Sequence, residues 1–116
     1  MTSMAPADTV AGVRDWFAKA KVAALALPGG IFRHPGDNFH RLTWSATTSH
    51  KLLLEFDDQL LLILTDPGEL EYTDTELTIR GCRQVTLDWQ EYVNMRSHVE
   101  DHGQGDVRLT VPGEGR

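Results

Sequence analysis

Several polar side chains able to bind a ligand or carry a proton are gathered in one short segment of this 116-residue chain, Ile31 to His40, which contains a Pro-Gly pair. Histidine titrates near neutral pH, an aspartate can orient it, and an arginine can clamp a carboxylate or a phosphate. Turn-rich loops commonly carry such sites. No nucleophile stands beside a base and no phosphate-binding glycine pattern is present, so ordinary turn residues with solvated histidines are the competing interpretation. The candidate ligand-binding residues are Arg33, His34, Asp37, Asn38 and His40.

Two histidines four positions apart, His98 and His102, have the spacing of two metal ligands on one face of a helix. Their spacing is that of the H-x-x-E-H motif of certain zinc peptidases, with Asp101 in the glutamate position. Gly103 follows at once, which disfavours a stable helix, and no downstream carboxylate stands in a good context for a third ligand. His98 and His102 are the only metal candidates, and we predict instead a solvated polar loop over residues 94–106 and no cofactor.

The single cysteine, Cys82, excludes an intramolecular disulfide and fits a reducing compartment. Arg80 and Arg83 could lower its pKa and favour thiolate chemistry, whereas a lone cysteine in a strand is more often a small buried hydrophobe. Asp88 and Glu91 could form a carboxylate pair, but solvation is the simpler expectation. We assign no catalytic residue and lean towards a protein that is not an enzyme.

The first element that could position these residues is an N-terminal amphipathic helix within Val10–Leu25. Asp8 or Thr9 can cap its free backbone amides, and Pro28 with the two following glycines can end it. Apolar residues recur at spacings of three and four and form one stripe. The stripe contains Val10, Val13, Phe17 and Ala20 or Ala24.

Beyond residue 40 the hydrophobic period changes to two, which is typical of half-buried strands. Connections too short for parallel crossovers predict an antiparallel sheet of six to seven short strands, mostly a meander. Trp16, Trp44 and Trp89 lie on the apolar phase of their elements and are expected to be core anchors. The predicted fold is therefore α+β, with the helix packed on a curved antiparallel sheet. A helix-plugged barrel or a small sandwich are the alternatives. We treat residues 1–116 as one domain, with 1–7 and 113–116 frayed.

A leucine-rich hairpin, formed by Lys51–Phe56 and Gln59–Thr65, breaks the alternation because it is apolar on both faces. Such strands must be covered on both faces, and each fully buried leucine contributes about 1.5–3 kcal/mol. The cover could be the curled sheet or loops of the same chain, a second copy of the chain, or a hydrophobic ligand in a cavity. A two-residue turn makes Leu53, Leu60, Leu62 and Leu64 the candidate interface, and a three-residue turn leaves Leu53, Leu61 and Ile63 outside.

The net charge of −6 disfavours nucleic acid and anionic membranes as partners. The longest near-apolar run, Leu60–Leu64, is too short to span a bilayer, and no signal-peptide pattern opens the chain, so a cytoplasmic location is expected. We predict a small non-enzymatic binding or accessory protein that acts through protein–protein contacts as a homodimer. The alternative is a small-ligand-binding protein or enzyme that uses the Ile31–His40 loop.

Overall fold

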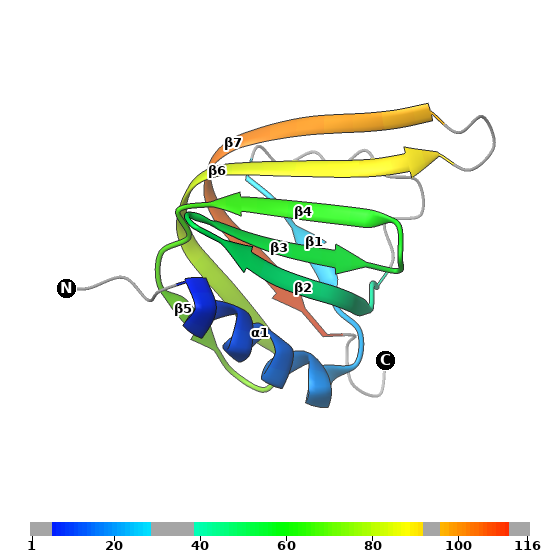
Figure 1. Cartoon of the computed structure of the whole chain (residues 1–116). Coiled ribbons are helices and arrows are strands. Elements are labelled where there is room, and N and C mark those ends of the chain that lie inside the picture. Colours follow the sequence, from blue (N-terminus) through cyan, green and yellow to red (C-terminus); the bar gives the residue numbers. More distant parts are fainter. Residues whose placement is uncertain (1–5, 29–38, 92–95, 112–116) are drawn as a thin grey trace.

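The computed structural model describes residues 6–28, 39–91 and 96–111, in which one helix accompanies one antiparallel sheet (Figure 1). The α+β class with an antiparallel sheet is therefore confirmed. The elements are α1 (Pro6–Ala20), β1 (Ala24–Ala26), β2 (Leu42–Thr48), β3 (Lys51–Phe56), β4 (Leu60–Thr65), β5 (Leu70–Tyr72), β6 (Glu76–Glu91) and β7 (Arg96–Thr110).

The strands follow the order β1-β7-β6-β4-β3-β2, and β5 pairs with the first part of β6. Gly81 takes a φ of 64°, and the register of β6 against β7 shifts between Ile79 and Thr86. These bulges bend both strands, since a bulge increases the local twist and turns the strand. An antiparallel bridge between Ala23 and His40 brings the two edges of the sheet together, with N···O distances of 2.9 and 2.7 Å.

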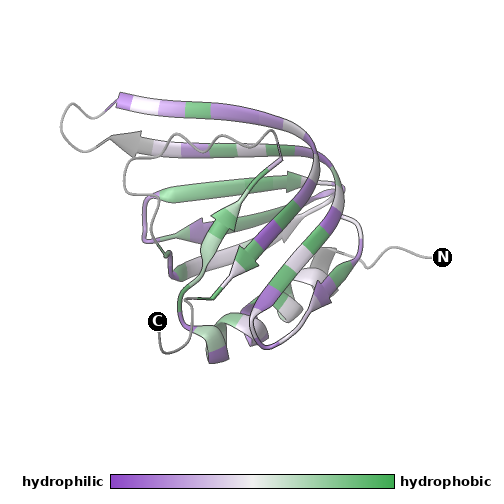
Figure 2. Cartoon of the chain, turned by 180° about the vertical axis from the view of Figure 1, so that it is seen from behind, coloured by the Kyte–Doolittle hydropathy of each residue, from purple (hydrophilic) through white to green (hydrophobic). Residues whose placement is uncertain are grey.

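The core lies between the inner face of the curled sheet and α1, which lies across the side between β2 and β5 (Figure 1). Burial alternates along β3 and β4, so that every second side chain enters the core. The remaining residues of β4 are also apolar, and Figure 2 shows this strand as hydrophobic along its length. The fully buried side chains from the hairpin are Leu52, Leu54, Phe56, Leu60, Leu62 and Leu64.

The helix begins and ends earlier than predicted. Pro6 is its first residue, which suits a proline because that position needs no N–H donor. Lys21 takes a φ of 73° after the last helical residue and donates its N–H to the Phe17 carbonyl oxygen at 2.9 Å. Ala24–Ala26 then pairs with β7, so tertiary pairing overrides the helix propensity of the alanines.

The predicted polar loop over residues 94–106 is wrong, because β7 begins at Arg96 and runs to Thr110. Gly81 lies at a bulge inside the single strand β6. The prediction failed because the first half of β7 carries polar side chains on both faces, which hides the alternation that marks a strand. Of the residues predicted to be frayed, 1–5 and 113–116 lie outside the described residues.

The leucine-rich hairpin turns through three residues, Asp57–Gln59, and both aspartates take positive φ. Leu53 therefore pairs with Ile63 and projects outward with it. The candidate interface built on a two-residue turn is corrected accordingly. Of its four members only Leu53 lies on the outer face, and Leu60, Leu62 and Leu64 are fully buried in the core.

A β-bulge in β2 reverses the predicted side of Trp44. Leu42 pairs with Phe56 while Trp44 pairs with Glu55, so Thr43 is an extra residue. Trp44 consequently projects outward and is 49% exposed, which corrects its assignment to the core. The two other tryptophans, Trp16 and Trp89, are core residues as predicted.

Candidate functional site

The outer face of the sheet carries five large apolar side chains in two rows, and in one row Glu55 lies between Trp44 and Leu61 and Asp88 between Leu61 and Val99. Trp44 on β2, Leu61 on β4 and Val99 on β7 belong to one row, and Leu53 and Ile63 form the next. The three hairpin residues are half-buried, whereas Trp44 and Val99 are 49% and 67% exposed. We call this set, Trp44, Leu53, Leu61, Ile63 and Val99, the outer apolar face.

Charged residues lie at one end of the outer apolar face, at Lys51, and within its row of Trp44, Leu61 and Val99, at Glu55 and Asp88. Along β3 the outward-facing residues are Lys51, Leu53 and Glu55, so a cation and an anion flank one leucine. Alternate residues of a strand are about 6.8 Å apart, which places the two charges roughly 13 Å apart. Asp88 on β6 adds a second carboxylate in the row of Glu55.

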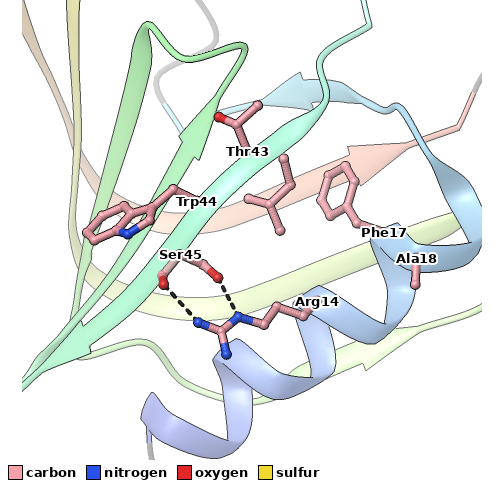
Figure 3. A pocket seen from close by; sticks show the side chains of 7 residues that line it. Arg14, Phe17, Ala18, Thr43, Trp44 and Ser45 are labelled. Carbon is pink, nitrogen blue, oxygen red and sulfur yellow. Dashed lines mark hydrogen bonds between the residues drawn. The ribbon is translucent and has the colours of Figure 1, made fainter.

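A groove of about 510 Å³ lies on the other side of β2, between this strand and α1 (Figure 3). Phe17 and Ala18 of α1 form one wall, and Leu42 and Thr43 of β2 form the other. Its further lining residues are Arg14, Trp44 and Ser45. The groove therefore combines apolar walls with one guanidinium group.

Arg14 is held against β2 by two hydrogen bonds to one residue. Its Nε donates to the Ser45 hydroxyl at 2.6 Å, and its Nη2 donates to the Ser45 carbonyl oxygen at 2.8 Å. The β2 bulge makes this contact possible, because it turns Ser45 towards the helix and Trp44 away from it. Thr43 supports the bulge, since its hydroxyl donates to the Glu55 carbonyl oxygen and accepts the Asp58 N–H, both at 3.1 Å.

Arg14 differs from three other arginines of the described residues in forming no ion pair. Arg80, Arg83 and Arg108 each hold a carboxylate within 4.0 Å. Within residues 6–28, 39–91 and 96–111, no carboxylate forms an ion pair with Arg14. Among the described residues, the partner of the Arg14 guanidinium in the groove is therefore Ser45, through its hydroxyl and its carbonyl oxygen.

The two metal candidates lie on one face of β7, with Glu100 between them. His98 stacks on the Trp89 ring at 4.3 Å, and Glu100 accepts a hydrogen bond from the Trp89 indole at 3.2 Å. His102 contacts the Pro28 carbonyl oxygen through Nδ1 at 3.0 Å and the Glu100 carboxylate through Nε2 at 3.1 Å. A carbonyl oxygen can only accept, so Nδ1 of His102 donates to Pro28.

His98 and His102 were metal candidates because positions four apart share one face of a helix. Both histidines lie on a strand, so that reason does not apply. Within the part of the chain that the structure describes, no group of three or more histidine, cysteine, aspartate or glutamate side chains could hold a metal ion. In the same part, no helix is both long and apolar enough to cross a membrane.

Of the candidate ligand-binding residues in the Ile31–His40 loop, only His40 is described. His40 is 3% exposed and its Nδ1 lies 2.6 Å from the Asp57 carboxylate, so it ties the segment before β2 to the β3–β4 turn. The other four, Arg33, His34, Asp37 and Asn38, lie outside the described residues.

Cys82 is fully buried, and burial, together with the nearby charge of Asp106, raises the pKa of its thiol to about 12. The hypothesis that neighbouring arginines lower this pKa is wrong, because Arg80 and Arg83 are exposed. Cys82 is a small buried hydrophobe, as the alternative interpretation held.

Sequence reasoning did not single out Arg14 and Ser45 as site residues. Arg14 lies off the apolar stripe of the helix, and no local pattern connects it with a serine 31 positions away. The bulge in β2 brings the two residues together. No residue type in β2 requires that bulge, so the sequence carries no signal that identifies them. No family model, curated protein or solved structure matches the chain.

Proposed function

We propose that this protein is a non-enzymatic binding protein that pairs with a second copy of itself through the outer apolar face. The observation that carries the proposal is the outward position of Leu53 and Ile63 in a hairpin whose inner face already fills the core. Exposed contiguous apolar surface commonly marks an association site. Trp44 supports this assignment, because an exposed tryptophan is a frequent anchor at interfaces.

A second copy is the favoured occupant because the face is complementary to itself. Consider two copies stacked sheet on sheet, with a two-fold axis between the sheets and perpendicular to β3. This axis can place Leu53 of one copy directly over Leu53 of the other. The same operation brings Lys51 of one copy over Glu55 of the other, twice per dimer. This arrangement pairs every charge that borders the leucine, and a two-fold axis parallel to β3 would instead oppose like charges.

The face is also large enough to support a weak dimer. Five strands about 4.8 Å apart and six residues about 3.4 Å apart project to roughly 500 Å². A standard interface buries about 800 Å² per partner, so the exposed Trp44 and Val99 at its two sides have to take part. We expect a dimer that dissociates on dilution.

Light scattering coupled to size-exclusion chromatography tests the proposal across a range of protein concentrations. We expect the wild type to change from monomer to dimer as concentration rises, and Ile63→Glu to stay monomeric because it places a carboxylate in the apolar contact. Tyr72→Glu is the matched control, since Tyr72 is 64% exposed on β5 and lies outside the proposed contact. A wild type that stays monomeric at every concentration overturns the proposal.

Charge exchange tests the geometry separately. Lys51→Glu alone should weaken the dimer at least about tenfold, because each lost ion pair becomes a like-charge contact. Adding Glu55→Lys should restore association, since the exchanged pair is again complementary. If the double variant stays as weak as the single one, the two-fold arrangement is wrong.

A further inference from the structure

We propose that the groove between α1 and β2 is a binding site for a small carboxylate with an aromatic body, held by Arg14. This inference goes beyond the proposed dimer, and Trp44 is the one residue that the groove shares with the outer apolar face. Three features define the site. They are the edge of the Arg14 guanidinium that Ser45 does not contact, the walls of the groove and the charge of Arg14.

The guanidinium presents one complete edge for a bidentate contact. Arginine has five N–H donors in a planar fork. The edge formed by Nε and Nη2 is used by Ser45. The edge formed by Nη1 and the second hydrogen of Nη2 has no partner among the described residues, and Figure 3 shows one guanidinium nitrogen directed away from Ser45. Two parallel N–H groups match the two oxygens of a carboxylate.

Ser45 also orients that edge in advance. An exposed arginine normally loses side-chain entropy when it binds a ligand. Here the two bonds to Ser45, at 2.6 and 2.8 Å, already fix the plane of the guanidinium. The cost of ordering Arg14 is therefore met within the protein, which is a property of a binding site more than of a solvated side chain.

The remaining walls select the body of the ligand. Phe17 and the partly exposed Leu42 line the groove beside Arg14, and the exposed Trp44 indole stands at its rim. Aromatic and aliphatic walls with a single polar anchor are typical of small-molecule sites, and a volume of about 510 Å³ falls in their usual range. A planar aromatic carboxylate satisfies both the fork and the walls.

The net charge of −6 supports Arg14 as the residue that binds the carboxylate. A small anion is repelled by most of such a protein, so a site for it needs a cation that no carboxylate of the protein neutralises. Arg14 meets this condition within the described residues.

The test is a titration of isotope-labelled protein with 3-phenylpropionate, followed by the NMR signals of the Arg14 Nε–H and the Ser45 backbone N–H. We expect saturable shifts of both signals below about 10 mM ligand. Acetate lacks the body and 3-phenylpropanol lacks the charge, so each should bind at least about tenfold more weakly. Absence of saturable shifts with 3-phenylpropionate, or equal binding of all three probes, overturns the proposal.

Substitutions distinguish bidentate binding by the Arg14 guanidinium from attraction to any positive charge. Arg14→Gln should lower the affinity for 3-phenylpropionate at least about tenfold, and Arg14→Lys should not restore it because an ammonium is a point charge. Lys19→Gln is the matched control, since it removes one charge from the same helix outside the groove. Ser45→Ala keeps the guanidinium and its bond to the backbone carbonyl oxygen but removes the bond from Nε, and should weaken binding by about twofold to fivefold. Equal losses in Arg14→Gln and Lys19→Gln contradict the assignment.

Discussion

Cys82 illustrates how burial decides the chemistry of a single residue. Its side chain is fully buried beside the bend of β6, and the pKa of the thiol is raised from 9.0 to about 12. The thiolate is the reactive form of cysteine. Two neighbouring arginines do not change this outcome, because their guanidinium groups lie in solvent.

We therefore expect Cys82 to resist alkylation by iodoacetamide at pH 8 in the folded protein and to react once urea unfolds it. Thiol titration with and without urea measures the difference. Rapid modification of the folded protein, at the rate seen in urea, would contradict the buried assignment.

The raised pKa also predicts how stability depends on pH. The folded thiol keeps its proton to about pH 12, whereas the unfolded thiol loses it near 9.0. Cys82 therefore contributes stability that is complete below pH 9, and this contribution declines as the pH rises towards 12. Urea unfolding at pH 8 and pH 10.5 should show a larger loss for the wild type than for Cys82→Ala, which removes the titrating group.

At the scale of elements, β2 determines which side chains reach the two proposed sites. The bulge places Trp44 on the outer apolar face and Ser45 under α1. Thr43 compensates the interrupted ladder with two hydrogen bonds at 3.1 Å. One irregular residue therefore supplies both the tryptophan of the face and the anchor of Arg14.

Thr43→Val should lower the free energy of unfolding by about 1–2 kcal/mol, because it removes one donor and one acceptor. Chemical denaturation measures the change, and iodide quenching reports whether Trp44 stays exposed. Thr47→Val is the matched control in the same strand, and we expect it to change stability by less than about 0.5 kcal/mol. Equal costs at the two positions would mean that the Thr43 hydroxyl does not support the bulge.

The extent of prediction from sequence also differs between elements. The bounds of β3, and the antiparallel pairing of the hairpin, follow from two apolar runs and the short turn between them. The end of α1 does not, because Ala24–Ala26 suits a helix locally and becomes a strand only when β7 lies beside it. The sequence does not predict that Trp44 lies on the outer face either, because an extra residue in a strand leaves no mark in the pattern of residue types.

The same reasoning separates the two candidate sites. The sequence predicts that the leucine-rich hairpin has a surplus apolar face, and Leu53 belongs to it in either register. The groove depends on contacts between α1 and β2 that are 31 positions apart. Non-local side-chain contacts of this kind require the fold to be known first.

At the scale of the whole molecule, α1 and the sheet share one core. Val13, Trp16 and Phe17 of the helix are buried against the strands, and the Trp16 indole donates to the Thr73 carbonyl oxygen at 2.8 Å. At the far end of β6, Trp89 is bonded to Glu100. The two buried tryptophans thus report on opposite parts of one structure.

We expect urea to unfold these parts in a single transition. In a Trp44→Phe background, Trp89→Phe leaves only Trp16 and Trp16→Phe leaves only Trp89. For each variant, the fluorescence transition should coincide with the transition in far-ultraviolet circular dichroism. Measurements at one protein concentration exclude the effect of association. A tryptophan signal that changes before the circular dichroism does would show that α1 or the end of β6 unfolds separately.

The bulge in β2 has a consequence for how the length of the gene can vary. Thr43 is the surplus residue of the strand, so losing its codon would leave Leu42 and Trp44 on their present faces in a regular ladder. Losing the codon for Ala46 would turn over the residues on one side of the deletion and break either the row of Trp44 or the hairpin pairing. Shortening by one codon is therefore tolerable at Thr43, and elsewhere in β2 it would disrupt a face of the protein.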